Sequence, residues 1–160
     1  MKYLIYGGNG WIGSQMIKLL EIDNIKYMKS KIRVDNTSDL EAEIQQYQPT
    51  NIMCFIGRTH GIFNQEKIGT IDYLEKPGKL VDNLRDNLFS PLSLALLCQQ
   101  YNIHLTYLGT GCIFTQAQDE IKDSTGYSED SLPDFFGSSY SIVKGFTDRL
   151  MHHFKNNVLN

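Results

Sequence analysis

The sequence predicts an α/β fold in which a doubly wound parallel sheet carries helices on both faces. Short apolar segments alternate with segments of helical periodicity, an order typical of such sheets. The first apolar segment runs into a glycine turn that opens a helix, and Asn51–Ile56 has the apolar character of a strand covered on both sides. With 160 residues, 41% of them hydrophobic, the chain is expected to fold as one domain, 1–160, without disulfides or metal.

Hydrophobic periodicity and helix-stop signals place the elements of the first half. They are a strand at Lys2–Tyr6, a helix at Trp11–Leu20, strands at Ile25–Met28 and Ile32–Val34, a helix at Asp39–Tyr47 and a strand at Asn51–Ile56. Thr37 or Ser38 would cap the second helix, and Pro49 follows its end. The segment Gly57–Gly78 lacks clear periodicity, and irregular connections of this length are usually functional.

The second half continues the alternation of helix and strand. Its segments are a long helix at Leu80–Tyr101, a strand at Ile103–Leu108, an irregular stretch at Thr115–Ser138 and a helix at Ser139–Phe154. The tail Asn156–Asn160 resembles a turn into one more strand, which we expect to be missing, so that the domain is truncated before its last strand. The sheet would then keep an exposed edge that favours self-association, for example as a homodimer.

Composition excludes several classes of partner and compartment. The pI near 5.8 and the lack of a basic run argue against binding to nucleic acid or to an anionic membrane. No apolar run approaches the roughly 20 residues of a membrane span, and the N-terminus lacks a signal-peptide core. Cys54, Cys98 and Cys112 are odd in number and widely spaced, as expected for reduced thiols of a cytoplasmic protein.

The glycine turn after the first strand predicts a dinucleotide site of the Rossmann type. Gly7, Gly10 and Gly13 stand in G-x-x-G-x-x-G spacing, with Asn9, Trp11 and Ile12 between them. Glycines permit a tight turn and close backbone approach, and the helix N-terminus offers unpaired N–H groups to a pyrophosphate. The alternative is a turn with a purely structural role.

The loop after the second strand indicates which nicotinamide cofactor is preferred. A carboxylate there would bind the ribose hydroxyls and repel a 2′-phosphate. The sequence has instead a basic cluster, Lys29, Ser30, Lys31 and Arg33, which suits a phosphate and favours NADPH, with NADH as the alternative. A solvated basic turn would explain the cluster equally simply. Asp35 could face the adenine edge or begin the turn before the next helix.

A tyrosine and a lysine in Y-x-x-x-K spacing, Tyr140 and Lys144, are the candidate catalytic pair. They lie one helical turn apart, so an ammonium could lower the tyrosine pKa and make the phenol a usable general acid. Thr110 follows the preceding strand at the sheet edge where ligands of α/β domains bind, and its hydroxyl could bind a substrate carbonyl. The alternative is an exposed Tyr–Lys pair on an amphipathic helix.

Three motifs carry a family resemblance: Gly7-Gly8-Asn9-Gly10-Trp11-Ile12-Gly13, Gly109-Thr110-Gly111-Cys112-Ile113-Phe114 and Phe136-Gly137-Ser138-Ser139-Tyr140-Ser141. The chain resembles the N-terminal cofactor-binding half of an extended short-chain dehydrogenase/reductase whose C-terminal substrate domain is absent. Within that family it is most similar to the 4-keto-rhamnose reductases and the bifunctional 3,5-epimerase/4-reductases. These enzymes act on UDP- or dTDP-4-keto-6-deoxy sugars, so the resemblance implies a nucleotide-sugar substrate.

The resemblance implies roles for individual residues. Tyr140 would give a proton to the C4 keto oxygen, Lys144 would hold the nicotinamide ribose and tune Tyr140, and Thr110 would orient the keto group. The residues that would cover the cofactor after the Asn51–Ile56 strand are Phe55, Ile56, Gly57 and Arg58.

Asn87 falls where these enzymes place an asparagine of the cofactor site, in a kinked helix. Pro91 has no N–H, so we expect it to leave the Asn87 carbonyl without its helical partner and open to a water of a proton relay. A plain proline kink without a relay is the alternative.

Cys112 is the secondary catalytic candidate. In the similar bifunctional enzymes a cysteine here is thought to exchange protons beside the ketone, and the alternative is an inert buried thiol. Dehydratases of the family tend to have carboxylates where Gly111 and Cys112 stand, which argues against that activity. Three hypotheses therefore remain: a nucleotide-sugar keto reductase, another extended reductase or dehydratase, and a non-catalytic dinucleotide-binding subunit.

The histidines and Trp11 are expected to have structural or solvent-exposed positions. His60, His104, His152 and His153 have no partners at metal-ligand spacing, so they are interpreted as structural or exposed, and no metal is expected. Trp11 is expected to pack beside the glycine turn.

Overall fold

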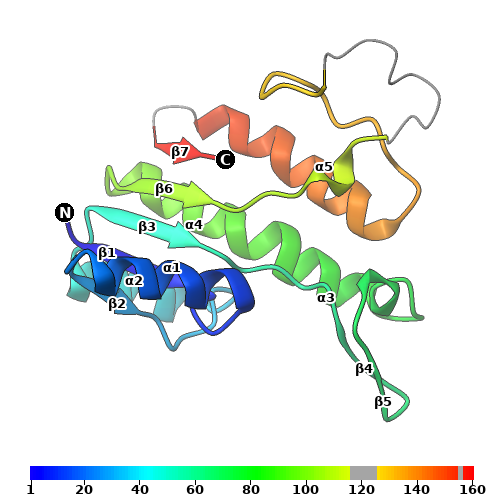
Figure 1. The fold of residues 1–160 in the computed structure, drawn as a ribbon, viewed down its shortest axis with the longest axis horizontal. Helices are drawn as coiled ribbons and strands as arrows, with labels where there is room; N and C mark the ends of the chain where they lie inside the picture. Colours follow the sequence, from blue (N-terminus) through cyan, green and yellow to red (C-terminus); the bar gives the residue numbers. More distant parts are fainter. Residues whose placement is uncertain (116–125, 155–156) are drawn as a thin grey trace.

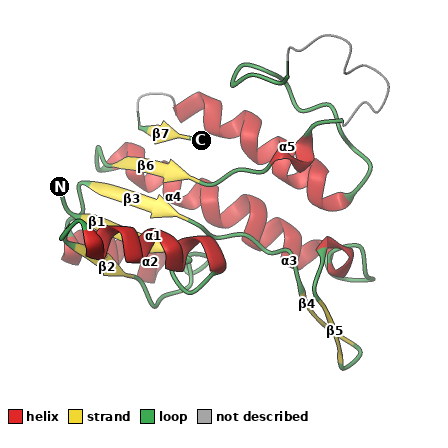
Figure 2. Ribbon diagram, viewed as in Figure 1, coloured by secondary structure: helices red, strands yellow, loops and turns green. Residues whose placement is uncertain are grey.

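The chain forms a five-stranded, fully parallel sheet in the order β2-β1-β3-β6-β7 (Figure 1). The computed structural model describes residues 1–115, 126–154 and 157–160. The strands are β1 (Tyr3–Tyr6), β2 (Tyr27–Lys29), β3 (Asn51–Cys54), β6 (His104–Tyr107) and β7 (Val158–Leu159). A separate antiparallel hairpin, β4 (Gly61–Phe63) and β5 (Glu66–Ile68), extends away from the sheet (Figure 2).

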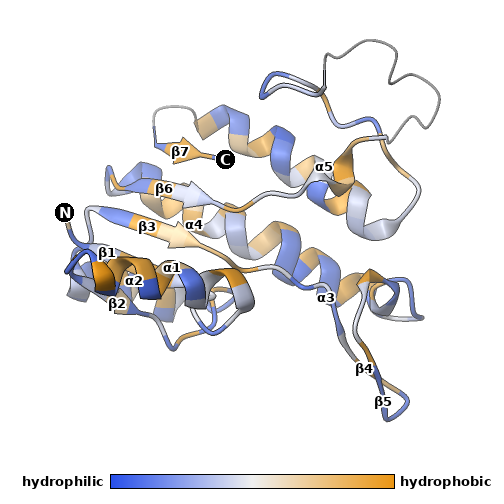
Figure 3. Ribbon diagram, in the orientation of Figure 1, coloured by the Kyte–Doolittle hydropathy of each residue, from blue (hydrophilic) through white to orange (hydrophobic). Residues whose placement is uncertain are grey.

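Helices cover both faces of the sheet, so the predicted fold class is confirmed. Helix α1 (Trp11–Ile22) lies on one face, whereas α2 (Thr37–Tyr47) and α4 (Ser90–Gln100) lie on the other (Figure 1). Helix α4 continues α3 (Leu80–Leu84) through a π-helical turn, Arg85–Phe89, and α5 (Ser139–Met151) packs beside it. Hydrophobic and hydrophilic residues alternate along α1 and α5, as expected for helices with one covered face (Figure 3).

The main core lies between the sheet and the helices α2, α4 and α5. Alternate strand residues point into it because successive side chains of a strand face opposite ways. These residues are Leu4, Tyr6, Ile52, Cys54, Leu105 and Tyr107. They meet buried side chains of the three helices, Leu40, Ile44, Leu94, Ala95, Cys98 and Met151. Within the described residues, no helix combines the length and the apolarity needed to cross a bilayer.

The strand order places a crevice at the carboxyl ends of β1 and β3. From β1 the chain crosses to β2 on one side, and from β3 it crosses to β6 on the other. At such a switch point the loops after the two central strands separate, and open α/β sheets bind their ligands there. The glycine turn follows β1, and Phe55 follows β3, so both border this crevice.

Several expectations for the first half are wrong in detail. Ile32 to Val34 form no strand: Asn36 N donates to Arg33 O in a turn, and Val34 is buried in the core from this loop. Helix α2 is capped by Asn36, whose Oδ1 accepts from Asp39 N at 3.3 Å, instead of by Thr37 or Ser38. An asparagine caps a helix as well as serine or threonine does, and it stands one residue earlier.

The irregular segment Gly57–Gly78 contains more structure than its sequence predicts. Asn64 and Gln65 both adopt positive φ, 49° and 67°, and form the two-residue turn of the β4–β5 hairpin. The usual signal for such a turn is Asn-Gly, and glutamine in the second position conceals it. A short 3-10 helix at Ile71–Tyr73 then leads towards α3.

The strand expected to be missing near the C-terminus is present. Val158 and Leu159 pair in parallel with Leu105 and Thr106 of β6, and Leu105 N also donates to Asn157 O at 2.7 Å. Two residues are too few to produce a periodic signal, so only the tertiary pairing reveals this strand. The tail thus forms a strand, whereas we expected only the turn before one.

Candidate functional site

The glycine turn is packed so tightly that two of its positions have no room for a side chain. Gly7 has φ +76°, and a Cβ there would lie 2.6 Å from the backbone carbon of Phe55. A Cβ on Gly13 would lie 2.4 Å from the carbonyl oxygen of Gly7. Gly10 caps α1 without a side-chain hydrogen bond, so the first N–H groups of the helix have no intrahelical or side-chain cap partner. The turn thus has the geometry that lets a pyrophosphate approach a helix N-terminus.

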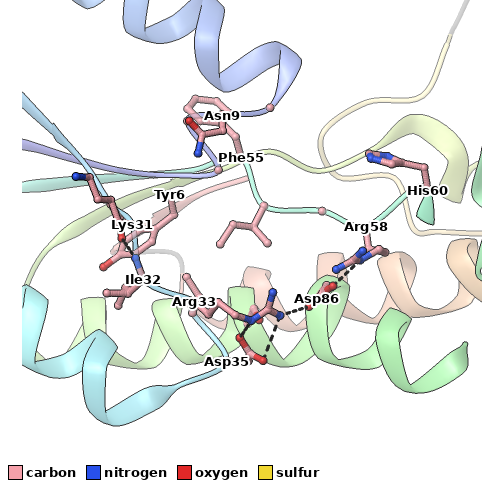
Figure 4. Close-up of a pocket in the computed structure, with 18 residues that line it drawn as sticks. Tyr6, Asn9, Lys31, Ile32, Arg33, Asp35, Phe55, Arg58, His60 and Asp86 are labelled. Atoms are coloured by element: carbon pink, nitrogen blue, oxygen red, sulfur yellow. Dashed lines mark hydrogen bonds and ion pairs between the residues drawn. The ribbon is translucent and has the colours of Figure 1, made fainter. Parts of the chain in front are cut away.

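A cavity of about 390 Å³ opens beside this turn at the crevice between β1 and β3 (Figure 4). It is lined by the turn, by the loop after β2, by the loop after β3 and by the π-helical turn. The lining residues are Tyr6, Gly7, Gly8, Asn9, Gly10, Ser30, Lys31, Ile32, Arg33, Val34, Asp35, Phe55, Ile56, Gly57, Arg58, His60, Asp86 and Ser90. Its volume is within the usual range for small-molecule sites.

Most predicted cofactor residues line this cavity, and the others lie near it or elsewhere. Gly7, Asn9, Gly10, Asp35, Phe55, Ile56, Gly57 and Arg58 line it. Lys29 stands behind the turn, where its Nζ donates to Asn9 Oδ1 at 3.1 Å. Trp11, Ile12 and Gly13 begin α1 outside the lining. Trp11 is 80% exposed, so the expectation that it packs beside the turn is wrong.

The basic loop after β2 is held by acidic side chains. Ser30 Oγ donates to Glu43 Oε2 at 2.8 Å, which fixes the start of the loop against α2. Arg33 Nε donates to Asp35 Oδ1 at 2.9 Å, so the Asp35 carboxylate is paired with a guanidinium of the same loop. Lys31 lines the cavity and has no ion pair among the described residues.

Asp86 lies at the centre of an ion cluster at the wall of the cavity (Figure 4). Its carboxylate accepts from Arg58 Nε at 2.7 Å and from Arg85 Nε at 2.8 Å, and it lies 3.4 Å from Arg33 Nη2. Burial raises the pKa of Asp86, but hydrogen bonds from Arg85 and Arg58 outweigh burial and hold the pKa below its ordinary value. Asp86 is therefore ionised at neutral pH. The sequence offered no motif that marks this residue.

Asn87 holds the loop after β3 in place. Its side-chain Oδ1 accepts from Arg58 N at 2.8 Å, and its Nδ2 donates to Arg58 O at 2.9 Å and to Asn83 Oδ1 at 2.8 Å. The residue is fully buried, so its amide supports the loop from behind and does not reach the cavity.

The Asn87 carbonyl is not open to a water, so this expectation is wrong. Thr147 Oγ1, on the neighbouring helix α5, lies 2.7 Å from it and 2.9 Å from Val143 O, so its one hydroxyl hydrogen is shared between two carbonyls, and Thr147 is fully buried. Pro91 does remove the helical donor, and the helix passes through a π-helical turn just before it, at Arg85–Phe89. The vacated acceptor is filled by a side chain from α5, which sequence periodicity does not reveal.

Thr147→Val is expected to lower the free energy of unfolding by about 2 kcal/mol, because it leaves the buried Asn87 carbonyl without this donor at nearly constant volume. Urea unfolding followed by circular dichroism measures the change. Thr147→Ser keeps the hydroxyl and is the matched control, expected to lose about 1 kcal/mol or less for the missing methyl group. Equal stability of Thr147→Val and the wild type would show that the hydrogen bond does not stabilise the helix pair.

Tyr140 and Thr110 are brought together at the carboxyl edge of the sheet. Burial raises the pKa of Tyr140, and a hydrogen bond with Thr110 offsets part of the rise. Tyr140 is buried against Tyr73 and Leu74, whereas Cys112 is exposed. Thr110 Oγ1 also accepts from Cys112 N at 3.2 Å, so Cys112 lies beside Thr110.

Lys144 contacts a different tyrosine from the one expected. Its Nζ donates to the Tyr107 hydroxyl and lies 4.6 Å from the centre of the Tyr107 ring. Burial lowers the pKa of Lys144 to about 8, and Cys54 and Asp148 oppose this shift. Lys144 is thus mainly charged at neutral pH, and among the described contacts its partner is Tyr107 instead of Tyr140.

The other candidate residues have clear positions. Cys54 and Cys98 are buried in the main core, where burial raises the pKa of each thiol. His60 lines the cavity, and the residues that the structure describes contain no cluster of metal-ligand side chains. Sequence reasoning missed Glu75, whose Oε1 accepts from Ser139 N at 2.9 Å and so helps to fix the start of the Tyr140 helix.

The fold and the site define a doubly wound α/β domain with a glycine turn after the first strand and a Y-x-x-x-K helix. No family model matches the chain. A protein of Acanthamoeba polyphaga mimivirus is 55% identical over 160 residues, which are 100% of this chain and 54% of that protein. Its crystal structure, described as a UDP-rhamnose synthase, superimposes with a TM-score of 0.92.

Two further proteins are similar, the first in sequence and the second in fold. A trifunctional UDP-glucose 4,6-dehydratase/UDP-4-keto-6-deoxy-D-glucose 3,5-epimerase/UDP-4-keto-L-rhamnose-reductase of Arabidopsis thaliana is 33% identical over 98% of this chain and 22% of its own length. A dTDP-4-dehydrorhamnose reductase of Bacillus anthracis, solved with NADP, is 19% identical with a TM-score of 0.78, over 98% of this chain and 51% of its own. The relatives that are at least 30% identical are thus described as enzymes of nucleotide-rhamnose synthesis. The chain spans about half the length of its mimivirus relative.

Proposed function

We propose that residues 1–160 form the NAD(P)-binding domain of an enzyme of nucleotide-rhamnose synthesis. The reaction is reduction of the 4-keto group of a UDP- or dTDP-4-keto-6-deoxy-hexose, with 3,5-epimerisation through Cys112 as a further step. The observation that carries this proposal is the glycine turn, with no room for a Cβ at Gly7 or Gly13, beside a cavity at the carboxyl end of the sheet. The mimivirus relative described as a UDP-rhamnose synthase supports it.

The residues present fit a dinucleotide. The glycine turn leaves no space for a Cβ at Gly7 or Gly13, and it presents the N-terminus of α1 to the cavity side of the sheet. Asn9, Phe55 and Arg58 line the cavity from two loops and would hold the adenosine half. When bound, a reduced nicotinamide supplies the hydride.

Tyr140 and Thr110 bind the keto oxygen and supply the proton that the reduction requires. Thr110 orients the keto oxygen, and Tyr140, protonated because burial raises its pKa, donates its hydroxyl proton to that oxygen. Lys144, charged at neutral pH, holds the nicotinamide ribose or acts on the site through Tyr107. Cys112 is exposed beside Thr110, where a thiol can reach the carbons next to the ketone.

NADPH is the proposed cofactor. Ser30 stands where a carboxylate would bind the ribose hydroxyls of NADH, and its hydroxyl is already engaged with Glu43. Lys31 and Arg33 line the cavity and supply positive charge for a 2′-phosphate. NADH remains the alternative because Asp35 also lines this end of the cavity.

A non-catalytic dinucleotide-binding subunit is the second candidate function. It is favoured by one contact, since Lys144 donates to Tyr107 and so is not engaged with Tyr140. Such a subunit would bind NADPH without supporting turnover when the second half of a relative is supplied.

The predicted homodimer remains a proposal for either function, testable by light scattering.

A fluorescence titration of the purified chain with NADPH and NADH tests the proposed cofactor role. We expect saturable binding of both cofactors with a preference for NADPH, because the cavity carries Lys31 and Arg33. Circular dichroism checks that the chain is folded in the same buffer. A folded chain that binds neither cofactor would contradict the proposal, and a preference for NADH would contradict its choice of NADPH.

A further inference from the structure

The π-helical turn brings one carboxylate between two loops of the cavity. Asp86 lies in this turn, and its two oxygens contact arginines of different loops. Oδ2 accepts from Arg58 of the loop after β3 at 2.7 Å, and Oδ1 lies 3.4 Å from Arg33 of the loop after β2 (Figure 4). The Asp86 side chain is only 9% exposed, so water screens these contacts weakly.

Arg33 is the most exposed of the three arginines in this cluster. Its side chain is 61% exposed and lines the cavity, whereas the Arg58 and Arg85 side chains are 31% and 33% exposed. Arg33 stands three residues after Ser30, the position from which a Rossmann-type site reads the adenosine ribose. Two carboxylates, Asp35 and Asp86, already contact its guanidinium. Each of them weakens the attraction of Arg33 for an additional anion.

Building on the proposed cofactor role, we propose that Asp86 is a specificity-determining residue that sets the preference between NADPH and NADH through its contact with Arg33. The two cofactors differ by the 2′-phosphate, so a carboxylate that shares Arg33 lowers the affinity for NADPH more than that for NADH. Asp86 acts from the π-helical turn at the wall of the cavity, through its contact with Arg33. It is therefore a positioning residue and touches no reacting atom.

Asp86→Asn tests the proposal by the ratio of the Kd of NADH to the Kd of NADPH. We expect the ratio to rise by about tenfold at low ionic strength and by less at 0.5 M salt, because charge interactions are screened. Asp82→Asn is the matched control, since Asp82 pairs with Arg85 and Lys79 and makes no contact with Arg33. Its ratio is expected to stay within about twofold of the wild type. A thermal melt confirms that each variant is folded.

Arg33→Gln gives a second measurement at an exposed side chain and does not depend on the stability of Asp86→Asn. It is expected to reduce the preference for NADPH to the part that Lys31 supplies, and Asp86→Asn in that background is expected to leave the ratio unchanged. Folded variants that bind both cofactors with an unaltered ratio would overturn this inference and leave the proposed function standing. A folded wild type that binds neither cofactor would overturn both.

Discussion

Replacing Tyr140 by Phe is expected to lower the rate of keto reduction by about 10²- to 10⁴-fold, the usual contribution of a positioned proton donor. The substitution removes only the hydroxyl, which is the proposed proton donor. The ring, buried against Tyr73 and Leu74, is retained, so the start of α5 keeps its packing. NADPH affinity should stay within about twofold of the wild type, because Tyr140 does not line the cavity beside the glycine turn.

The rate is measured by NADPH oxidation with a UDP-4-keto-6-deoxy sugar in a chimera of this chain and the second half of its mimivirus relative. This pairing suits a chain that is 55% identical to that relative and spans about half of it. Tyr73→Phe is the matched control, because Tyr73 packs against Tyr140 but directs its hydroxyl to Asp82 at 2.6 Å. Undiminished turnover by Tyr140→Phe would remove Tyr140 from the mechanism.

The order of the elements was predictable because each major strand and helix has its own periodic pattern. Features fixed by contacts between distant segments were not. The two-residue strand β7 exists only through its pairing with Leu105 and Thr106, and the apolar run at Ile32 to Val34 packs into the core from a loop. Neither outcome follows from local periodicity, since tertiary pairing and burial override it.

In the candidate site, too, local sequence patterns predict some residues, whereas others depend on contacts between distant segments. The glycine turn was predictable because its spacing follows from one strand and one helix start, whereas the nearness of Thr110 to Tyr140 depends on how two distant segments pack. Asp86 and Glu75 were not predictable, since their roles depend on which distant loop or helix end lies beside them. The carbonyl of Asn87 shows the limit most clearly: proline chemistry predicts a vacant acceptor, but only the packing of α5 reveals that Thr147 fills it.

Gly13→Ala is expected to lower the free energy of unfolding by about 3 kcal/mol, the upper part of the range for an overpacked site. The added Cβ would lie 2.4 Å from the Gly7 carbonyl oxygen and 2.9 Å from Gly8 Cα. Both are backbone atoms, so no side-chain rotation relieves the contact, and the turn must move away from α1. Urea unfolding of the purified chain measures the loss, which is a large share of the stability of a typical domain.

The same displacement is expected to weaken NADPH binding by more than about tenfold, because the pyrophosphate needs the turn and the helix N-terminus in register. Gly69→Ala is the control for the loss of a glycine as such, since a Cβ there meets no atom within 4 Å. Its stability and affinity should match the wild type. If Gly13→Ala lost stability but bound NADPH normally, the close contact of turn and helix would serve the fold alone. The cofactor would then have to be held mainly by the loops after β2 and β3.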